Sequence, residues 1–428
     1  MEALLSSPGP EQSETLINSL KYGLDPQGNY IQVRRASTTF SNVNSASPQS
    51  VKQITNNCGS SSEWLDPQSV LLSFLITNGD NANELWPATT GCHCLFDRLT
   101  LKMGSTVVED IQDFNKITQM LTRLSVPADK HKDQAQLGFG SDATNEHDAR
   151  KIAASGSKRV YMKFDVSGLL SQHRMLPLFS LGGQGFSIQL NLAPAVQAVI
   201  VSDSGTTYST TYTLSDIRLL ADMISLDSEL QESYNSALLN GTSLKICCRS
   251  WESLVNYLAA DSSGSFDVAI SKSYTRLATL LCQFNQSEDA NYAGKAKWVN
   301  SGYFPTAKSE NIEYHLALGS RRIPDNDVRG TSESWFRLHN AVGNYHSLAH
   351  ATSITEDEYR STQYSLAVDC EKVPSLMASG ENLSGGQTIF LKCKGFGSSS
   401  IDVPRRAFIC MHFEKVISIM DTVVECYS

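Results

Sequence analysis

Short runs in which apolar and polar residues alternate make up most of the chain. Residues 160–166 (VYMKFDV) and 186–192 (FSIQLNL) place an apolar side chain at every second position, which is the spacing of a strand with one buried face. Residues 276–284, 312–318 and 388–396 repeat this alternation, and Gly- and Ser-rich turns separate the runs. The pattern predicts mostly antiparallel β structure in both halves, with residues 160–166 and 186–192 as neighbouring core strands.

The middle of the chain changes its hydrophobic period twice. Residues 217–223 alternate as in a strand, residues 226–238 carry apolar side chains at helical spacing, and residues 244–248 alternate again. Asp227 stands where a helix N-cap is expected, and Gly241 follows the last helical position. The sequence therefore predicts a strand, a helix and a second strand in succession, with the helix as a hinge.

Two further stretches have helical spacing. Apolar side chains of residues 107–124 (VVEDIQDFNKITQMLTRL) form one stripe over several turns. Residues 331–343 form the other stretch, in which Ser332 can cap the N-terminus and Gly343 can end the helix. Each half of the chain is thus predicted to contain strands, then a helix, then more strands.

These elements predict an all-β chain with a few short inserted helices. A chain of 428 residues is too long for one ordinary core. We expect an extended N-terminal arm over residues 1–62, a first β-sandwich over 63–225, a helical linker over 226–243 and a second β-sandwich over 244–428. The jelly roll is one kind of β-sandwich. It occurs in viral capsid proteins, lectins and cupins, so the fold alone does not identify the function.

Composition narrows the function. The chain has a net charge of -9, and its basic residues occur singly or in isolated pairs such as Arg34 and Arg35. A nucleic-acid binder usually carries a basic stripe or tail, so we expect little direct binding of nucleic acid. The N-terminus lacks a signal-peptide pattern, and no apolar run approaches the length needed to cross a bilayer. We expect a soluble protein from a reducing compartment, with its ten cysteines mostly buried as free thiols.

Two clusters could suggest a metal site. In Cys92-His93-Cys94 the two thiols are spaced i and i+2, and two such neighbours are poorly placed to bind the same metal ion. Cys58 could approach them in space. His346 and His350 share helical spacing but lack the internal Glu of a zinc-protease helix. Buried thiols and surface histidines are the simpler interpretation, and we predict neither a metal site nor a cofactor.

No catalytic motif stands out either. Ser155 and Lys158 match the S-x-x-K nucleophile pattern without its companion motifs. The glycine stretches at residues 181–186 and 394–400 do not follow the spacing of a phosphate-binding loop. The sequence predicts no catalytic residues, and a non-enzymatic role is favoured.

Several strings of the chain, in their order, resemble a known family. They are GSTVVEDIQDFNKITQMLTRL, FSIQLNLAPA, YTLSDIRLLADMISLDSELQESYNSALLNG, SLKICCRSW, SYTRLATLLCQF and IEYHLALGSRRIPDNDVRGTSESWFRLHNAVG. Together they resemble the major capsid proteins of small eukaryotic double-jelly-roll DNA viruses, of the adintovirus, Polinton-like and virophage type. The resemblance spans about residues 25 to 420.

The resemblance implies a specific architecture and role. It implies two tandem eight-stranded jelly rolls, joined by the helix of residues 226–243, in a structural protein of the virion. It further implies homotrimeric capsomers of pseudo-hexagonal outline that tile an icosahedral shell. Penton or minor capsid proteins would be partners, and separate basic proteins or an internal membrane would lie between the shell and the nucleic acid.

Two alternatives remain open at this point. One is a minor capsid component, although such proteins usually have a single jelly roll. The other is a carbohydrate- or receptor-binding β-sandwich, in which exposed tryptophans would form sugar platforms, although tryptophans more often pack in cores or interfaces. The candidates for such platforms are Trp64, Trp86, Trp251, Trp298 and Trp335.

Overall fold

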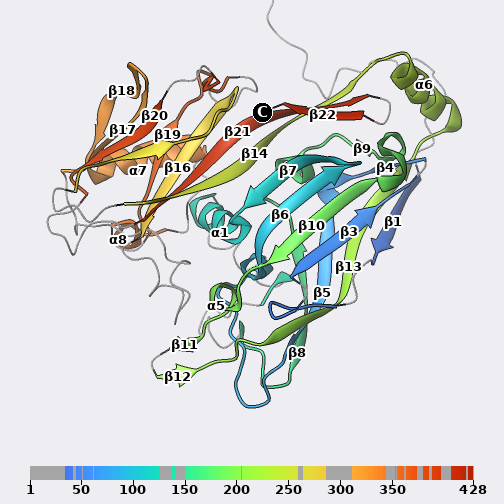
Figure 1. Ribbon diagram of the computed structural model, residues 1–428, viewed down its shortest axis with the longest axis horizontal. Coiled ribbons are helices and arrows are strands. Elements are labelled where there is room, and N and C mark those ends of the chain that lie inside the picture. The colour runs from blue at the N-terminus through green and yellow to red at the C-terminus, as the bar shows by residue number, and fades with distance from the viewer. Residues whose placement is uncertain are drawn as a thin grey trace, which may run out of the picture.

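The fold is described from a computed structural model. It describes residues 34–41, 45–50, 52–60, 62–125, 137–139, 150–203, 205–258, 264–285, 311–343, 352, 354–360, 363–373, 379–384, 388–396, 406–420 and 423–427. Two β-rich lobes lie side by side, with residues up to 225 in lobe 1 and residues from 244 in lobe 2 (Figure 1). Within these residues, no helix is long and apolar enough to cross a membrane.

Lobe 1 contains two main antiparallel sheets. In the first, strand order is β1 (Arg34–Phe40), β13 (Tyr212–Ser225), β5 (Leu71–Asn78) and β8 (Ser157–Lys163). In the second it is β3 (Gln53–Cys58), β10 (Phe186–Leu192), β6 (Phe96–Met103) and β7 (Thr106–Gln112). Shorter strands β2 (Ser45–Ala46), β4 (Glu63–Leu65) and β9 (Leu176–Pro177) extend the first sheet, and β11 (Ser202–Asp203) pairs with β12 (Thr206–Thr207).

Lobe 2 repeats this topology. Its first sheet has the order β14 (Leu244–Tyr257), β21 (Arg406–Met420), β16 (Leu277–Asn285) and β19 (Ser365–Asp369), and β22 (Val423–Tyr427) pairs with β21. Its second sheet has the order β15 (Phe266–Ile270), β20 (Ile389–Lys394), β17 (Glu313–Leu318) and β18 (Arg321–Arg329). Counting the eight main strands of each lobe along the chain, both lobes have the order 1-8-3-6 in one sheet and 2-7-4-5 in the other. This is the jelly-roll arrangement, so the prediction of two tandem eight-stranded jelly rolls is confirmed.

The hairpin between the fourth and fifth strands is built alike in the two lobes. Gly104 turns the chain between β6 and β7 with φ 59°, and Gly319 does so between β17 and β18 with φ 58°. A helix follows the fifth strand in each lobe, namely α1 (Phe114–Ser125) and α7 (Gly330–Val342). The residue where strand gives way to helix is left-handed in both lobes, Asp113 with φ 49° and Gly330 with φ 73°. The two lobes therefore share local geometry as well as topology.

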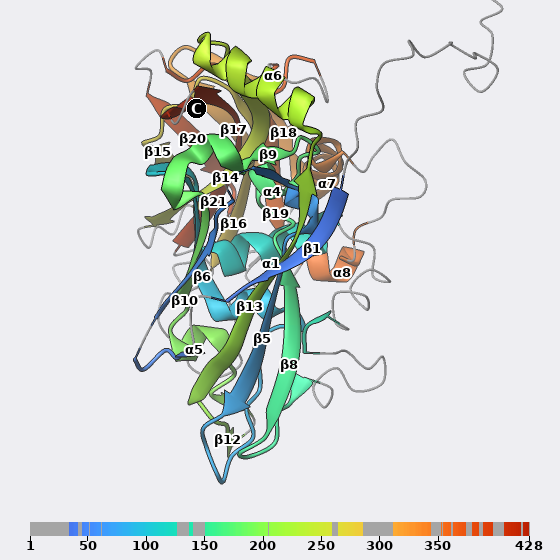
Figure 2. The same cartoon turned by 90° about the vertical axis from the view of Figure 1, so that its right-hand side faces the viewer.

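The hinge helix agrees with its prediction. It is α6 (Ser228–Leu239), and the side chain of Asp227 accepts a hydrogen bond from the backbone N–H of Glu229. Figure 2 shows α6 as a separate rod at one end of the molecule. Trp64 of lobe 1 holds it through an indole N–H that donates to Gln231 Oε1 at 3.0 Å, and through a ring contact with Tyr234 at 5.1 Å.

Two helix predictions need correction. Residues 106–112 form strand β7, and the helix begins only at Phe114. Pairing with β6 across the Gly104 turn fixes the extended conformation, and Val107 is exposed although the helical stripe predicted it to be buried. In α7 the N-cap is Arg329, not Ser332, because the helix begins one turn earlier than predicted. Gly343 does end α7 in a left-handed conformation, as predicted.

Two predictions about strand placement also need correction. Residues 34–58 were expected in an extended arm, but β1, β2 and β3 lie there and pair with strands of lobe 1. Their many polar residues gave no strand signal, because each of these strands exposes one face. Residues 1–33 of the expected arm lie outside the described residues. β8 and β10 are not neighbours, since they belong to different sheets of the lobe. Similar alternation shows that both strands have a buried face but not which strand each one pairs with.

Candidate assembly surfaces

Lobe 1 contacts lobe 2 through the edge strand β7. Thr106 Oγ1 donates to the carbonyl oxygen of Val424 in β22 at 3.1 Å. Lys415 of β21 reaches in the other direction, and its Nζ donates to the carbonyl oxygen of Val108 at 2.9 Å. Further along, Ser253 Oγ of β14 lies 3.0 Å from Asp113 Oδ2. Strand β7 is thus held along its length by β14, β21 and β22 of the other lobe.

The carboxylate of Glu109 is the centre of this contact. Its side chain lies on β7 and is 1% exposed. Ser250 Oγ of lobe 2 donates to Glu109 Oε1 at 2.6 Å, while Ser167 Oγ donates to Oε2 at 2.5 Å and the backbone N–H of Gly168 donates to Oε1 at 3.0 Å. Hydrogen bonds to a charged group are stronger than neutral ones, and a buried carboxylate without them would be costly. Glu109 therefore links both lobes and the start of α4 (Gly168–Ser171).

Gly168 brings the two backbones together at the same place. A Cβ atom at this position would lie 1.7 Å from the carbonyl oxygen of Arg249 in β14. No real side chain fits such a gap, so the contact between α4 and β14 requires glycine. The sequence contained no signal for this contact, because a single glycine beside a serine looks like an ordinary turn.

The strands that correspond to β7 and β14 in the opposite lobes are exposed. In lobe 2 the fifth strand is β18, whose exposed side chains are Arg321, Arg322, Asp325, Asn326 and Arg329. In lobe 1 the first strand is β1, which exposes Arg35, Ser37 and Thr39 and, among the described strands, pairs only with β13. The chain thus joins the fifth strand of one lobe to the first strand of the next, and among the described residues no such contact involves β18 or β1.

Cys92, His93, Cys94 and Cys58, which were considered for metal binding, are buried. Cys92, His93 and Cys94 lie in a short 3-10 helix, η5 (Cys92–Leu95), and all are buried. Burial raises the pKa of the Cys92 and Cys94 thiols and raises that of Cys58 to about 12. His93 Nε2 lies 3.0 Å from Gln119 Oε1 of α1. Over the described ranges, no three His, Cys, Asp or Glu side chains are grouped to hold a metal ion.

Ser155 and Lys158 have local roles as well. Ser155 occupies a turn with φ 54°, and Lys158 Nζ donates to the carbonyl oxygen of Phe139 at 2.7 Å. His346 and His350 lie outside the described residues. The prediction that most cysteines are buried is confirmed, because eight of the ten are buried.

Four of the five tryptophans are packed against other rings. Trp64 is 8% exposed, and the rings of Trp86, Trp251 and Trp335 lie within 4.7 Å of another ring. Their partners are Tyr208, His412 and Tyr359 respectively. Trp298 lies outside the described residues. None of the four described tryptophans is fully exposed, and packing against a neighbouring ring is the contact that they share.

Comparison with known proteins gives a structural match but no sequence match. No protein-family model and no curated protein sequence matches this chain. The capsid protein VP54 of PBCV-1, in a crystal structure fitted into a reconstruction of the virophage Sputnik, is similar with a TM-score of 0.64 and 11% identity, over 96% of this chain and 99% of that one.

Two other viral structures are similar over nearly the whole chain. The Faustovirus major capsid protein has a TM-score of 0.59 and 9% identity, over 96% of this chain and 93% of that one. A chain of the Sputnik virophage structure has a TM-score of 0.59 and 10% identity, over 99% of this chain and 92% of that one. At such low identity the likeness concerns the fold. This protein therefore has the double-jelly-roll fold found in the major capsid proteins of these DNA viruses.

Proposed function

We propose that this protein is a major capsid protein whose trimers, with a pseudo-hexagonal outline, tile an icosahedral virus shell. The fold supports a capsid role, because it matches viral capsid proteins over almost the whole length of both chains. The observation that carries the assembly step is the pair of unlike strands left exposed, β18 on lobe 2 and β1 on lobe 1. No catalytic step is part of this role.

The contact inside the chain suggests how copies associate. It is head-to-tail, because the fifth strand of one jelly roll meets the first strand of the next. A second copy can repeat it by placing its β1 and β13 against β18 of the first. Head-to-tail contacts form either open filaments or closed rings. A ring of three chains contains six lobes of one fold, which accounts for a pseudo-hexagonal outline.

The wider setting follows from the same role. The protein would be located in the virion, with penton or minor capsid proteins at positions that trimers cannot fill. Its net charge of -9 argues against direct condensation of a genome. Basic proteins or an internal membrane would then separate the shell from the nucleic acid.

Light scattering of the purified protein, with negative-stain imaging of the same sample, tests the proposal. We expect a particle close to three times the chain mass of 46.9 kDa, with a hexagonal outline, or closed shells. The double variant Asp325→Lys/Asn326→Lys places two like charges on exposed positions of β18 and should give monomers. Thr206→Lys/Thr207→Lys, on the exposed strand β12, is the matched control and should stay trimeric. A stable monomer of the unmodified protein would exclude the proposed assembly.

A further inference from the structure

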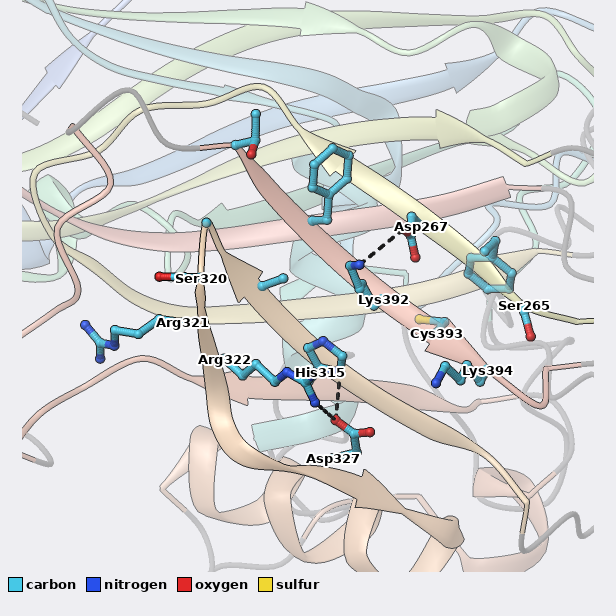
Figure 3. A pocket seen from close by; sticks show the side chains of 15 residues that line it. Ser265, Asp267, His315, Ser320, Arg321, Arg322, Asp327, Lys392, Cys393 and Lys394 are labelled. Carbon is cyan, nitrogen blue, oxygen red and sulfur yellow. Dashed lines mark ion pairs between the residues drawn. The ribbon is translucent and has the colours of Figure 1, made fainter.

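A cavity of about 840 Å³ lies on the outward face of the second sheet of lobe 2 (Figure 3). Side chains of β17 alternate, so that Tyr314 and Leu316 enter the core while His315 and Ala317 point to the cavity. Strand β20 contributes Phe390, which is half-buried. The turn and first residues of β18 curve over one side of the cavity. This face is distinct from the contact between the lobes.

Cations outnumber anions in the lining. Arg322 of β18 and Lys392 and Lys394 of β20 face the cavity from two strands (Figure 3). Arg322 NH1 lies 3.6 Å from Asp327 Oδ1, and Lys392 Nζ lies 3.7 Å from Asp267 Oδ2, so both ion pairs are loose. No ion pair joins Lys394 to a described residue. An excess of positive charge therefore gathers in one hollow of a protein whose net charge is -9.

His315 occupies the floor between these cations and is 7% exposed. Its Nδ1 lies 2.9 Å from Asp327 Oδ1, which leaves Nε2 as the other polar atom of the ring. Burial lowers the pKa of His315, the neighbouring Asp327 opposes this shift, and the cations of Arg322, Lys392 and Lys394 lower the pKa further. An anion in the cavity would screen those cations and favour the protonated ring.

The arginine on the corresponding sheet of lobe 1 is tightly paired. There, Arg98 of β6 makes two hydrogen bonds of 2.7 Å to the carboxylate of Asp110 on β7. A guanidinium held by both oxygens of a carboxylate has little capacity left for another anion. In lobe 2, Arg321 is similarly engaged, because its NH1 lies 2.8 Å from Glu381 Oε1. The cations that remain for a ligand are those of Arg322, Lys392 and Lys394.

We propose that this cavity binds a multiply charged oxyanion, carried on a phosphate or sulfate ester, with Arg322, Lys392 and Lys394 as its charged partners and His315 as a proton-dependent donor. Arg donates to such groups through two parallel N–H bonds, and Lys acts as a point charge. The volume leaves room for the organic part of an ester beside Phe390. The site goes beyond the capsid role and does not depend on it.

Calorimetric titration with sucrose octasulfate tests the site, with sucrose as the uncharged control ligand. We expect saturable binding of the sulfated sugar and none of sucrose. Lys392→Gln/Lys394→Gln should weaken the affinity by about tenfold or more, since each removes a charged partner. Lys52→Gln/Lys102→Gln removes two lysines at the corresponding sheet of lobe 1 and should leave the affinity unchanged. Equal affinity of both double variants, or no binding by the unmodified protein, would refute the site.

Two further arms define the ligand and separate this site from assembly. Inorganic tripolyphosphate in place of the sulfated sugar shows whether phosphate or sulfate groups are preferred, and binding of either supports the site. Sulfate esters keep their charge between pH 8 and 5.5, so tighter binding at the lower pH reports on the protein, and His315→Gln should abolish that difference. An affinity that does not depend on pH would contradict the role of His315 as a proton-dependent donor to the ligand. Light scattering of the same samples measures whether the protein assembles. A loss of assembly would count against the proposed capsid role and not against the anion site.

Discussion

Strands β7 and β18 occupy the same place in two copies of one fold, yet their surroundings differ. Both follow a Gly-Ser turn and end at a left-handed residue before a helix. Strand β7 is covered by lobe 2 and buries the carboxylate of Glu109, whereas β18 exposes five of its nine side chains. The fold thus fixes where an edge strand lies, and the side chains decide whether it meets a partner within the chain or remains open.

The acids at the outward face of the two strands make the same point on a smaller scale. Asp110 of β7 binds Arg98 through two hydrogen bonds, whereas Asp327 of β18 binds the buried ring of His315. One lobe therefore has a charge pair that is complete at every ordinary pH. The other has a pair whose charge changes when His315 takes up a proton, and burial lowers the pKa of His315, which moves that change toward acid. Four variants test the contact between the lobes and the charged and titratable groups of each lobe, from the largest expected effect to the smallest.

Gly168→Ala should break the contact between the lobes. The added Cβ would clash with the Arg249 carbonyl, so α4 and β14 must separate. We expect a loss of at least ~4 kcal/mol in the free energy of unfolding, at the upper end for a single substitution. Urea unfolding followed by tryptophan fluorescence should show two transitions, one for each lobe. Gly59→Ala, where nothing lies within 4 Å, is the control and should unfold like the unmodified protein.

Glu109→Ala should weaken the same contact without a clash. It leaves the hydroxyls of Ser167 and Ser250 and the N–H of Gly168 without their acceptor. We expect a loss of about 2–4 kcal/mol in the free energy of unfolding. Asp325→Ala removes an exposed acid from β18 and should change it by less than ~0.5 kcal/mol. Equal effects of the two variants would contradict the difference drawn between the two strands.

Acid should destabilise lobe 2 through His412. Its ring stacks on Trp251 at 4.2 Å, and burial together with the charge of Arg249 lowers its pKa from 6.5 to about 3. The unfolded chain takes up this proton first, so stability is unaffected above pH 6.5 and falls as the pH drops toward 3. At pH 5 the loss should be about 2 kcal/mol.

Thermal unfolding at pH 7 and pH 5 measures this effect. His412→Phe keeps an aromatic ring against Trp251 but cannot be protonated, so it should remove that part of the acid sensitivity. The same shift in both proteins would show that other groups cause it. We expect the melting temperature to fall in the thermal transition that corresponds to the unfolding of lobe 2.

Asp110→Asn should have the smallest effect of the four. Arg98 and Asp110 are 43% and 30% exposed, so solvent screens their attraction. We expect a loss of about 0.5–1 kcal/mol at pH 7. Although burial raises the pKa of Asp110, hydrogen bonds from Arg98 and Thr100 hold it below its usual range. The contribution is therefore present above the unfolded-state pKa and is lost as the pH falls through the lower folded-state value, which urea titrations at pH 7 and pH 3 can measure.

The sequence predicted the architecture because alternation and caps are local signals. The strands over residues 186–192 and 312–318 and the helix after Asp227 were all predicted from short patterns, and the structure confirms them. Residues 107–112 show the limit of such patterns, since the same apolar spacing fits a strand and a helix over two turns. Pairing with β6, which depends on the Gly104 turn, decides the outcome.

Neither candidate surface could be predicted in this way. Glu109 and Ser250 are 141 positions apart, and the cavity combines His315 and Arg322 with Lys392 and Lys394 of another strand. Jelly-roll topology brings such distant positions together, and short sequence patterns do not reveal these contacts. Strand β1 was missed for a related reason, because a polar edge strand resembles an extended arm until its partner β13 is known.

The distribution of the thiols has a practical consequence for labelling. Burial raises the pKa of the buried thiols, such as those of Cys282 and Cys410, and so suppresses the thiolate that reacts with maleimides. Cys247 on β14 is the exposed exception, and it lies two residues from Lys245, whose carbonyl accepts a hydrogen bond from Arg174 of lobe 1. A fluorophore attached there, without any engineered cysteine, would report on the junction between the two lobes.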